Sequence, residues 1–193
     1  MISQKRNVVV DTTFLDAVYR LQIFDKLVFL YSKVFIPVEV EREFLSDKNR
    51  DRDSRFSFLL SSFSRYSWLV KCNSFDEMII KLLSAEPDIH RGESEVIAQV
   101  RELGMKTYSE SSLSAVIDDQ RARVVASRME VDIVGTLKIL ALFHFNGFLD
   151  YHKSVNKLRR AGVRYRNDVV QLAFDKTESE FKSGVISFSD NVD

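Results

Sequence analysis

The feature that most constrains this chain is a repeated unit in which a short β-branched run leads directly into a helical pattern. The run Asn7 to Asp11 reads Asn-Val-Val-Val-Asp, and apolar residues at helical spacing follow from Phe14 to Ile23. The run Lys33 to Pro37 and the helix-compatible stretch Val38 to Leu45 repeat the unit. Because neighbouring parallel strands need a crossover connection, this alternation predicts an α/β fold with a central parallel sheet flanked by helices in three layers.

The rest of the chain continues the same alternation. We expect strands at 68–72, 114–117 and 132–134, and helices at 76–84, 93–103, 120–129, 136–146, 151–161 and 167–182. Gly104 is predicted to end the helix that begins at Glu93. Residues 46–65 are interpreted as a mobile charged connection with a Phe- and Ser-rich helix-like piece, and the last few residues as frayed. We expect a main domain at 1–165, with 46–65 as a charged insertion, and a C-terminal helix and tail at 166–193.

Composition limits the classes of partner and compartment. The 28 basic and 28 acidic residues give no net charge, so any contact with nucleic acid must come from local patches. A single cysteine, Cys72, excludes an intramolecular disulfide and a multi-cysteine zinc site. No signal-peptide pattern and no apolar run of about 20 residues is found, so we expect a cytoplasmic protein without membrane contact.

Acidic residues recur where strands end and where the following helices begin. Seven share this placement: Asp11, Glu39, Glu43, Glu93, Glu95, Asp118 and Asp119. Taken singly, each acid is as well explained by a structural role as by a functional one, because it can cap a helix or offset the helix dipole. Because the carboxyl ends of parallel strands share one edge of the sheet, we expect these carboxylates to crowd and to repel one another unless a cation neutralises them.

The donor atoms indicate which cation fits. Carboxylate oxygens and waters suit Mg²⁺ or Mn²⁺, whereas three scattered histidines and one cysteine do not build a zinc site. Such a centre can activate water and stabilise an in-line displacement at phosphorus. The matching chemistry is hydrolysis of RNA or DNA.

Five segments, taken in order, resemble a known family. They read Val-Val-Val-Asp11-Thr-Thr, Ile-Pro-Val-Glu-Val-Glu-Arg-Glu43-Phe, Gly-Glu93-Ser-Glu-Val-Ile-Ala, Ile-Asp-Asp119-Gln-Arg-Ala-Arg and Val-Gly-Thr136-Leu. Together they resemble the PIN-domain superfamily, and most closely its VapC-like members. The resemblance spans about 8–162.

The resemblance implies a role for each acid. Asp11 would be the metal ligand of the first strand, with Thr12 or Thr13 orienting it or a bound water. Glu43, Glu93 and Asp119 would be the other principal metal-binding and catalytic acids. In each of these three motifs a neighbouring acid is an alternative ligand: Glu39, Glu95 and Asp118.

The resemblance also implies contacts with a substrate. Thr12, Arg121, Arg123 and Thr136 are candidates, although basic residues near acids commonly form exposed ion pairs instead. Tyr165, within a basic cluster, could stack on a base or belong to a solvated helix face. The ladder of Phe residues between Arg55 and Arg65 could contact a partner chain.

The function implied is a metal-dependent endoribonuclease that cleaves RNA as the toxin of a toxin–antitoxin pair. An antitoxin protein and a homodimer are the partners that the resemblance suggests. The alternatives are a catalytically degenerate PIN-like module that binds RNA or protein, and a PIN-like nuclease that acts on DNA. No Gly-x-Gly-x-x-Gly follows the first strand, which argues against a dinucleotide-binding domain.

Overall fold

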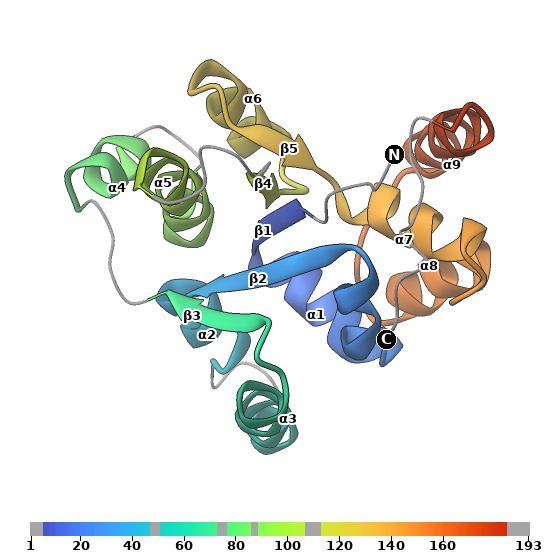
Figure 1. Ribbon diagram of the computed structural model, residues 1–193, viewed down its shortest axis with the longest axis horizontal. Helices are drawn as coiled ribbons and strands as arrows, with labels where there is room; N and C mark the ends of the chain where they lie inside the picture. Colours follow the sequence, from blue (N-terminus) through green and yellow to red (C-terminus); the bar gives the residue numbers. More distant parts are fainter. Residues whose placement is uncertain (1–5, 47–50, 73–76, 86–88, 107–112, 185–193) are drawn as a thin grey trace.

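Five parallel strands form a single sheet at the centre of the molecule (Figure 1). The computed structural model describes residues 6–46, 51–72, 77–85, 89–106 and 113–184. The strands are β1 (Arg6–Val10), β2 (Tyr31–Pro37), β3 (Leu69–Cys72), β4 (Leu113–Val116) and β5 (Asp132–Val134). Their order across the sheet is β3-β2-β1-β4-β5, and every neighbouring pair is parallel.

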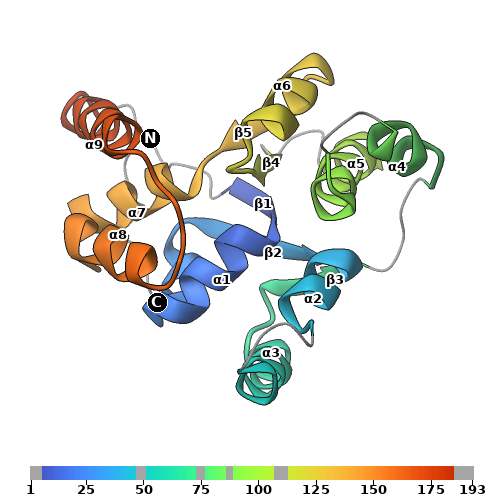
Figure 2. The same cartoon turned by 180° about the vertical axis from the view of Figure 1, so that it is seen from behind.

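Helices cover both faces of the sheet, as Figures 1 and 2 show. The helices are α1 (Thr12–Leu21), α2 (Val38–Phe44), α3 (Arg52–Arg65), α4 (Glu77–Ser84), α5 (Arg91–Lys106), α6 (Gln120–Arg128), α7 (Thr136–Phe145), α8 (Tyr151–Arg160) and α9 (Asn167–Lys182), with a 3-10 helix η1 (Phe24–Phe29). Helices α4 and α5 lie on one side, whereas α1, α7, α8 and α9 lie on the other. The predicted three-layer α/β fold is confirmed. None of the described helices is long and apolar enough to cross a lipid bilayer.

The order of the strands contains one reversal, and it lies next to β1. The chain runs outward from β1 through β2 to β3 and then returns to place β4 on the other side of β1. Because parallel crossovers are right-handed, this reversal sends the connecting helices to opposite faces. The crevice outside the carboxyl ends of β1 and β4 is therefore the place where a sheet of this kind binds ligands.

The central strand explains why its sequence is apolar without alternation. Val8, Val9 and Val10 are at most 1% exposed, because β1 has strands on both sides and helices on both faces. Val9 is paired with Phe35 of β2 and with Ala115 of β4. The strand thus fixes the position of the residue that follows it, Asp11.

Two local predictions are wrong. Helix α5 begins at Arg91 and continues through Gly104 to Lys106, so this glycine does not end it. A glycine costs a helix only about 1 kcal/mol, and α5 buries Val96, Ile97 and Val100 in the core. The mobile connection is also wrong for 52–55, which form the first turn of helix α3, whereas the helix-like piece expected after them is confirmed as the rest of α3, which ends at Arg65. Residues 47–50 and the predicted frayed tail at 189–193 lie outside the described residues.

The C-terminal helix packs on the core. Helix α7 is buried around most of its circumference, and α9 lies against it. The hydroxyl of Tyr151, in α8, donates a hydrogen bond of 2.8 Å to the carbonyl of Val170 in α9. These contacts join α7, α8 and α9 into one packed unit.

Candidate metal centre

Asp11 lies where the topology predicts a ligand site. It follows β1 and caps the amino end of α1, with its Oδ1 accepting a 2.7 Å hydrogen bond from the backbone N–H of Phe14. Its Oδ2 accepts a 3.3 Å bond from the backbone N–H of Asp118, just beyond β4. Only 6% of Asp11 is exposed, so one buried carboxylate bridges the carboxyl ends of β1 and β4.

The surroundings of Asp11 oppose its ionisation. Burial is the largest influence and raises its pKa well above the ordinary value of 3.8, and the negative charge of Asp118 raises it further. The N–H donors of Phe14 and Asp118 lower the pKa, and the carboxylate of Glu93 raises it again. The ionised form of Asp11 is therefore costly unless a positive charge lies beside it.

Asp118 is held by groups from three separate segments. Its Oδ1 accepts a 2.8 Å bond from the backbone N–H of Thr136, at the start of α7. Its Oδ2 accepts a 3.2 Å bond from the hydroxyl of Tyr165, in the connection between α8 and α9. The guanidinium of Arg123 lies 3.9 Å from Oδ1. The orientation of Asp118 beside Asp11 thus depends on the C-terminal part of the chain.

Asp119 has a different environment from its neighbour. It is exposed and caps α6, where its Oδ1 accepts bonds of 2.8 and 2.9 Å from the backbone N–H groups of Arg121 and Ala122. Its charge raises the pKa of Glu93, which places the two carboxylates near each other. The acidic doublet therefore divides, with Asp118 beside Asp11 and Asp119 toward Glu93.

Glu43 and Glu93 approach the same edge from α2 and α5. The hydroxyl of Thr12 donates a 2.5 Å hydrogen bond to Oε2 of Glu43. Glu93 accepts a 2.7 Å bond from the backbone N–H of His90, and burial is the main reason that its pKa is raised. The charges of Asp119 and Glu43 raise the pKa of Glu93 further.

Glu39 and Glu95 instead form hydrogen bonds and ion pairs that link α2 to α5 and involve nearby arginines. Oε2 of Glu95 accepts a 2.9 Å bond from the backbone N–H of Glu39, and Oε1 lies 3.4 Å from Nε of Arg91. Glu39 forms an ion pair with Arg42. These bonds join the start of α2 to α5, so both glutamates have a structural explanation independent of a metal.

The electrostatic influences among the acids define one group, which we call the acidic rim: Asp11, Glu43, Glu93, Asp118 and Asp119. In the described part of the chain, no three His, Cys, Asp or Glu side chains already enclose a metal position. Several rim carboxylates are turned toward N–H and O–H donors of the protein itself. The all-oxygen donor set suits a hard divalent cation, and coordination would require some of these side chains to exchange those bonds for metal.

The residues predicted to contact substrate differ in their exposure and in their hydrogen-bond partners. Arg121 is exposed in the first turn of α6, and Thr12 is bonded to Glu43. Thr136 is fully buried and meets Asp118 through its backbone. Arg123 donates a 2.7 Å bond from Nε to the carbonyl of Ile117, which gives it a structural use at the end of β4.

Tyr165 is the residue at the rim whose position the sequence did not reveal. The sequence presents it as an aromatic residue among basic ones, whereas its hydroxyl donates to Asp118, 47 residues earlier. Burial and the charge of Asp118 raise its pKa, so the hydroxyl keeps its proton and remains a donor. No local pattern marks such a long-range contact.

Comparison with known proteins identifies the family of the chain. No curated protein matches the chain. A family model described as a PIN domain matches residues 7–179, a span that contains every acid of the rim and reaches into α9. The chain therefore belongs to the PIN-domain family.

Proposed function

We propose that this PIN-domain protein is a metal-dependent endoribonuclease. PIN domains are generally nucleases, and the observation that carries the proposal is the buried Asp11 carboxylate bonded across to Asp118 at the reversal between β1 and β4. An uncompensated carboxylate in that position costs stability. A site that retains it beside further carboxylates is best explained by a divalent cation.

Mg²⁺ or Mn²⁺ would be held by Asp11 and Asp118, and Glu43, Glu93 and Asp119 would supply the further oxygen donors once their side chains turn from their present partners toward the ion. When bound, such an ion lowers the pKa of a coordinated water and offsets the charge that develops on the phosphate. The residues of the chain supply orientation: Thr12 holds Glu43, and Tyr165 with the N–H of Thr136 holds Asp118. Arg121, exposed in the first turn of α6 next to Asp119, would contact a substrate phosphate.

The narrower parts of the proposal are the substrate and the setting. RNA as substrate, a role as the toxin of a toxin–antitoxin pair, an antitoxin partner and a homodimer follow from the resemblance of the motifs to VapC-like proteins. A toxin role predicts that expression of the chain arrests growth and that an Asp11→Asn variant does not. Continued growth of cells that express the active enzyme would show that the protein is a ribonuclease but not a toxin.

The activity is tested by incubating end-labelled single-stranded RNA, hairpin RNA and single-stranded DNA with the protein and Mg²⁺, Mn²⁺ or EDTA. We expect internal cleavage of RNA that requires the metal. Cleavage of DNA but not of RNA would show that the substrate is DNA. No cleavage of either polymer, together with no Mn²⁺ binding by calorimetry, would favour the degenerate binding module.

Replacing Gly92 by Ala is expected to impair the centre with little loss of stability. A Cβ at this position would lie 2.8 Å from Oε2 of Glu43, so the carboxylate must shift, and its bond with Thr12 is disturbed. Displaced supports of metal ligands cost roughly 10–100-fold in affinity or activity. Calorimetry with Mn²⁺ and the cleavage rate should both show this loss. Gly104→Ala is the control, since nothing lies within 4 Å of its added Cβ.

Replacing Tyr165 by Phe is expected to lower kcat by roughly 10-fold or more, within the range for groups that orient metal ligands. The phenyl ring keeps the packing but loses the bond to Asp118. A role in orientation moves kcat with little change in KM and weakens Mn²⁺ binding, whereas a packing role alone moves only the melting temperature. Tyr151→Phe is a matched control, because its hydroxyl bonds to Val170 on α9.

A further inference from the structure

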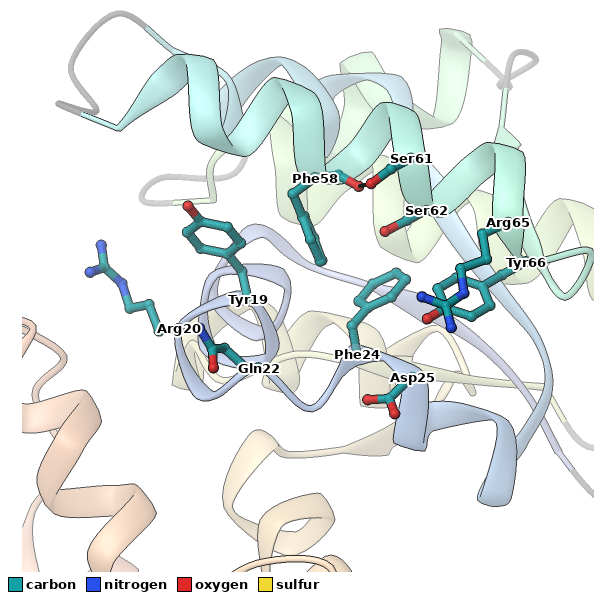
Figure 3. A pocket seen from close by; sticks show the side chains of 10 residues that line it. All are labelled: Tyr19, Arg20, Gln22, Phe24, Asp25, Phe58, Ser61, Ser62, Arg65 and Tyr66. Carbon is teal, nitrogen blue, oxygen red and sulfur yellow. Dashed lines mark hydrogen bonds between the residues drawn. The ribbon is translucent and has the colours of Figure 1, made fainter.

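A hollow lies at the opposite edge of the sheet from the acidic rim. Its volume is about 570 Å³, and its wall comes from the end of α1, from η1 and from α3 (Figure 3). Helix α1 starts beside Asp11 and runs antiparallel to the strands for ten residues, or about 15 Å. The residues from Tyr19 to Gln22 therefore lie a helix length away from the rim, and we call this hollow the distal cavity.

The distal cavity has an aromatic wall. Tyr19, Phe24, Phe58 and Tyr66 line it, and their rings point toward one another across the space between α1 and α3. The ring of Phe58 is 5.1 Å from that of Tyr19 and 5.1 Å from that of Phe24, in edge-to-face contact. Trp68 stacks behind Tyr66 at 4.9 Å. Phe24 is only 4% exposed, so the partly exposed rings of Tyr19, Phe58 and Tyr66 supply the aromatic surface that a flat ligand would contact.

Charged and polar groups stand around the aromatic wall. Arg20, Asp25 and Arg65 line the cavity with the hydroxyls of Ser61 and Ser62. Arg20 is paired with Asp16 at 2.6 Å, and Asp25 with Lys26 at 3.0 Å.

The position of Arg65 differs from that of the other two charged groups. It is exposed, and its guanidinium lies 5.3 Å from the centre of the Tyr66 ring, beside the cavity. A cation next to an aromatic surface suits a ligand that is flat at one end and anionic at the other.

Helix α3 holds its side of the cavity in a fixed position. Arg55, on the same helix, is 2% exposed and forms ion pairs of 2.5 Å with Asp16 and 2.8 Å with Asp51. Its guanidinium also lies 4.5 Å from the ring centre of Phe44. The cavity is therefore preformed, and its volume falls within the range of roughly 300–1,000 Å³ usual for ligand sites.

We propose that the distal cavity binds a nucleotide unit, with the base against the aromatic wall and the phosphate on Arg65. Bases stack on aromatic side chains irrespective of sequence, and a guanidinium pairs with phosphate through two parallel hydrogen bonds. The hydroxyls of Ser61 and Ser62 can bond to the edge of the base. The nucleotide is either free or part of an RNA strand, and only the second source rests on the proposed function.

Calorimetry in EDTA tests the proposal without requiring cleavage. Adenosine and cytidine monophosphate and a single-stranded RNA are titrated into the wild-type chain, and the fluorescence of Trp68, its single tryptophan, is followed in parallel. We expect saturable binding with a change in Trp68 emission. Arg65→Ala should weaken it about 10-fold or more, a change of about 1.4 kcal/mol. Arg65→Lys should recover only part of the loss, because an ammonium lacks the planar fork.

The controls show whether the ligand is a free nucleotide or an RNA strand. They also distinguish failure of the distal site from failure of the proposed nuclease activity. Arg160→Ala, an exposed arginine on α8, should leave binding unchanged. Binding of both monophosphates and RNA indicates a free nucleotide, whereas binding of RNA alone, with a higher KM and unchanged kcat in Arg65→Ala, indicates an extension of the substrate site. Binding that survives in Arg65→Ala, or no binding of any of the three ligands, overturns the distal site and leaves the acidic rim untouched.

Discussion

Asp11→Asn is expected to abolish metal-dependent cleavage while it stabilises the metal-free protein. The substitution removes a ligand from the acidic rim. It keeps an oxygen at Oδ1 to accept the N–H of Phe14, whereas an amide NH₂ replaces the Oδ2 that accepts only a long 3.3 Å bond from Asp118. We expect a loss of activity on the order of 10²-fold or more, because changes to groups that merely support metal ligands already cost roughly 10–100-fold. The cleavage assay and Mn²⁺ calorimetry give the two readouts.

The gain in stability follows from the sign of the pKa shift. Burial first, and then Asp118, raise the pKa of Asp11 above its ordinary 3.8, so the folded protein holds this proton more tightly than the unfolded chain does. In the metal-free wild type, the free energy of unfolding should therefore fall as the pH rises from 3.8 through the raised value. Asparagine cannot ionise, so the variant should lack this decrease.

Thermal unfolding in EDTA, followed across this pH range, measures the difference. Each kcal/mol gained at neutral pH corresponds to roughly 2–4 °C in a chain of this size. Asp53→Asn, at an exposed position on α3, is the control and should change neither activity nor stability. Full activity in Asp11→Asn would remove Asp11 from the catalytic centre, and a lower melting temperature would show that its charge is compensated without metal.

The layout of the sheet was predictable because each strand is marked locally. A run such as Val8 to Val10 is apolar without alternation since it is covered on both faces, and the acid that follows it reaches the edge where ligands bind. The fold class therefore predicted that these acids lie at one edge of the sheet. The family resemblance added which of them to expect as the principal metal ligands.

Which acid of each pair joins the acidic rim depends on the direction of its side chain. The neighbouring sequence does not determine that direction. Glu39 and Glu43 lie one helical turn apart, yet one pairs with Arg42 and the other meets Thr12 from α1. Asp118 and Asp119 are adjacent, but only Asp118 reaches Tyr165. These partners lie 31 and 47 residues away in the sequence, so no local spacing predicts them.

Arg55 shows the same limit in a structural residue. Charged side chains are almost never fully buried unless they are paired, so a run rich in Arg and Asp predicts a solvated connection. Arg55 is nevertheless 2% exposed, because it meets Asp16, 39 residues away on α1, and the rings of Tyr19 and Phe44. The charge that suggested a mobile segment is the one that fixes α3 to the body of the domain.

Arg55→Ala is accordingly expected to lower the free energy of unfolding by about 3 kcal/mol. Loss of one partner of a buried ion pair costs roughly 3–5 kcal/mol. The lower end applies here, because Asp16 keeps its 2.6 Å pair with Arg20 and the side chain of Asp51 is 41% exposed. The melting temperature should fall by roughly 6–12 °C.

Urea unfolding of the variant beside Arg52→Ala separates burial from charge, since Arg52 is an exposed arginine on the same helix. Arg52→Ala should stay within about 0.5 kcal/mol of the wild type. A loss below about 1 kcal/mol in Arg55→Ala would mean that α3 is held by its apolar contacts, such as Leu59, rather than by the guanidinium. The distal cavity would still have its wall in that case, but Arg55 would no longer account for its rigidity.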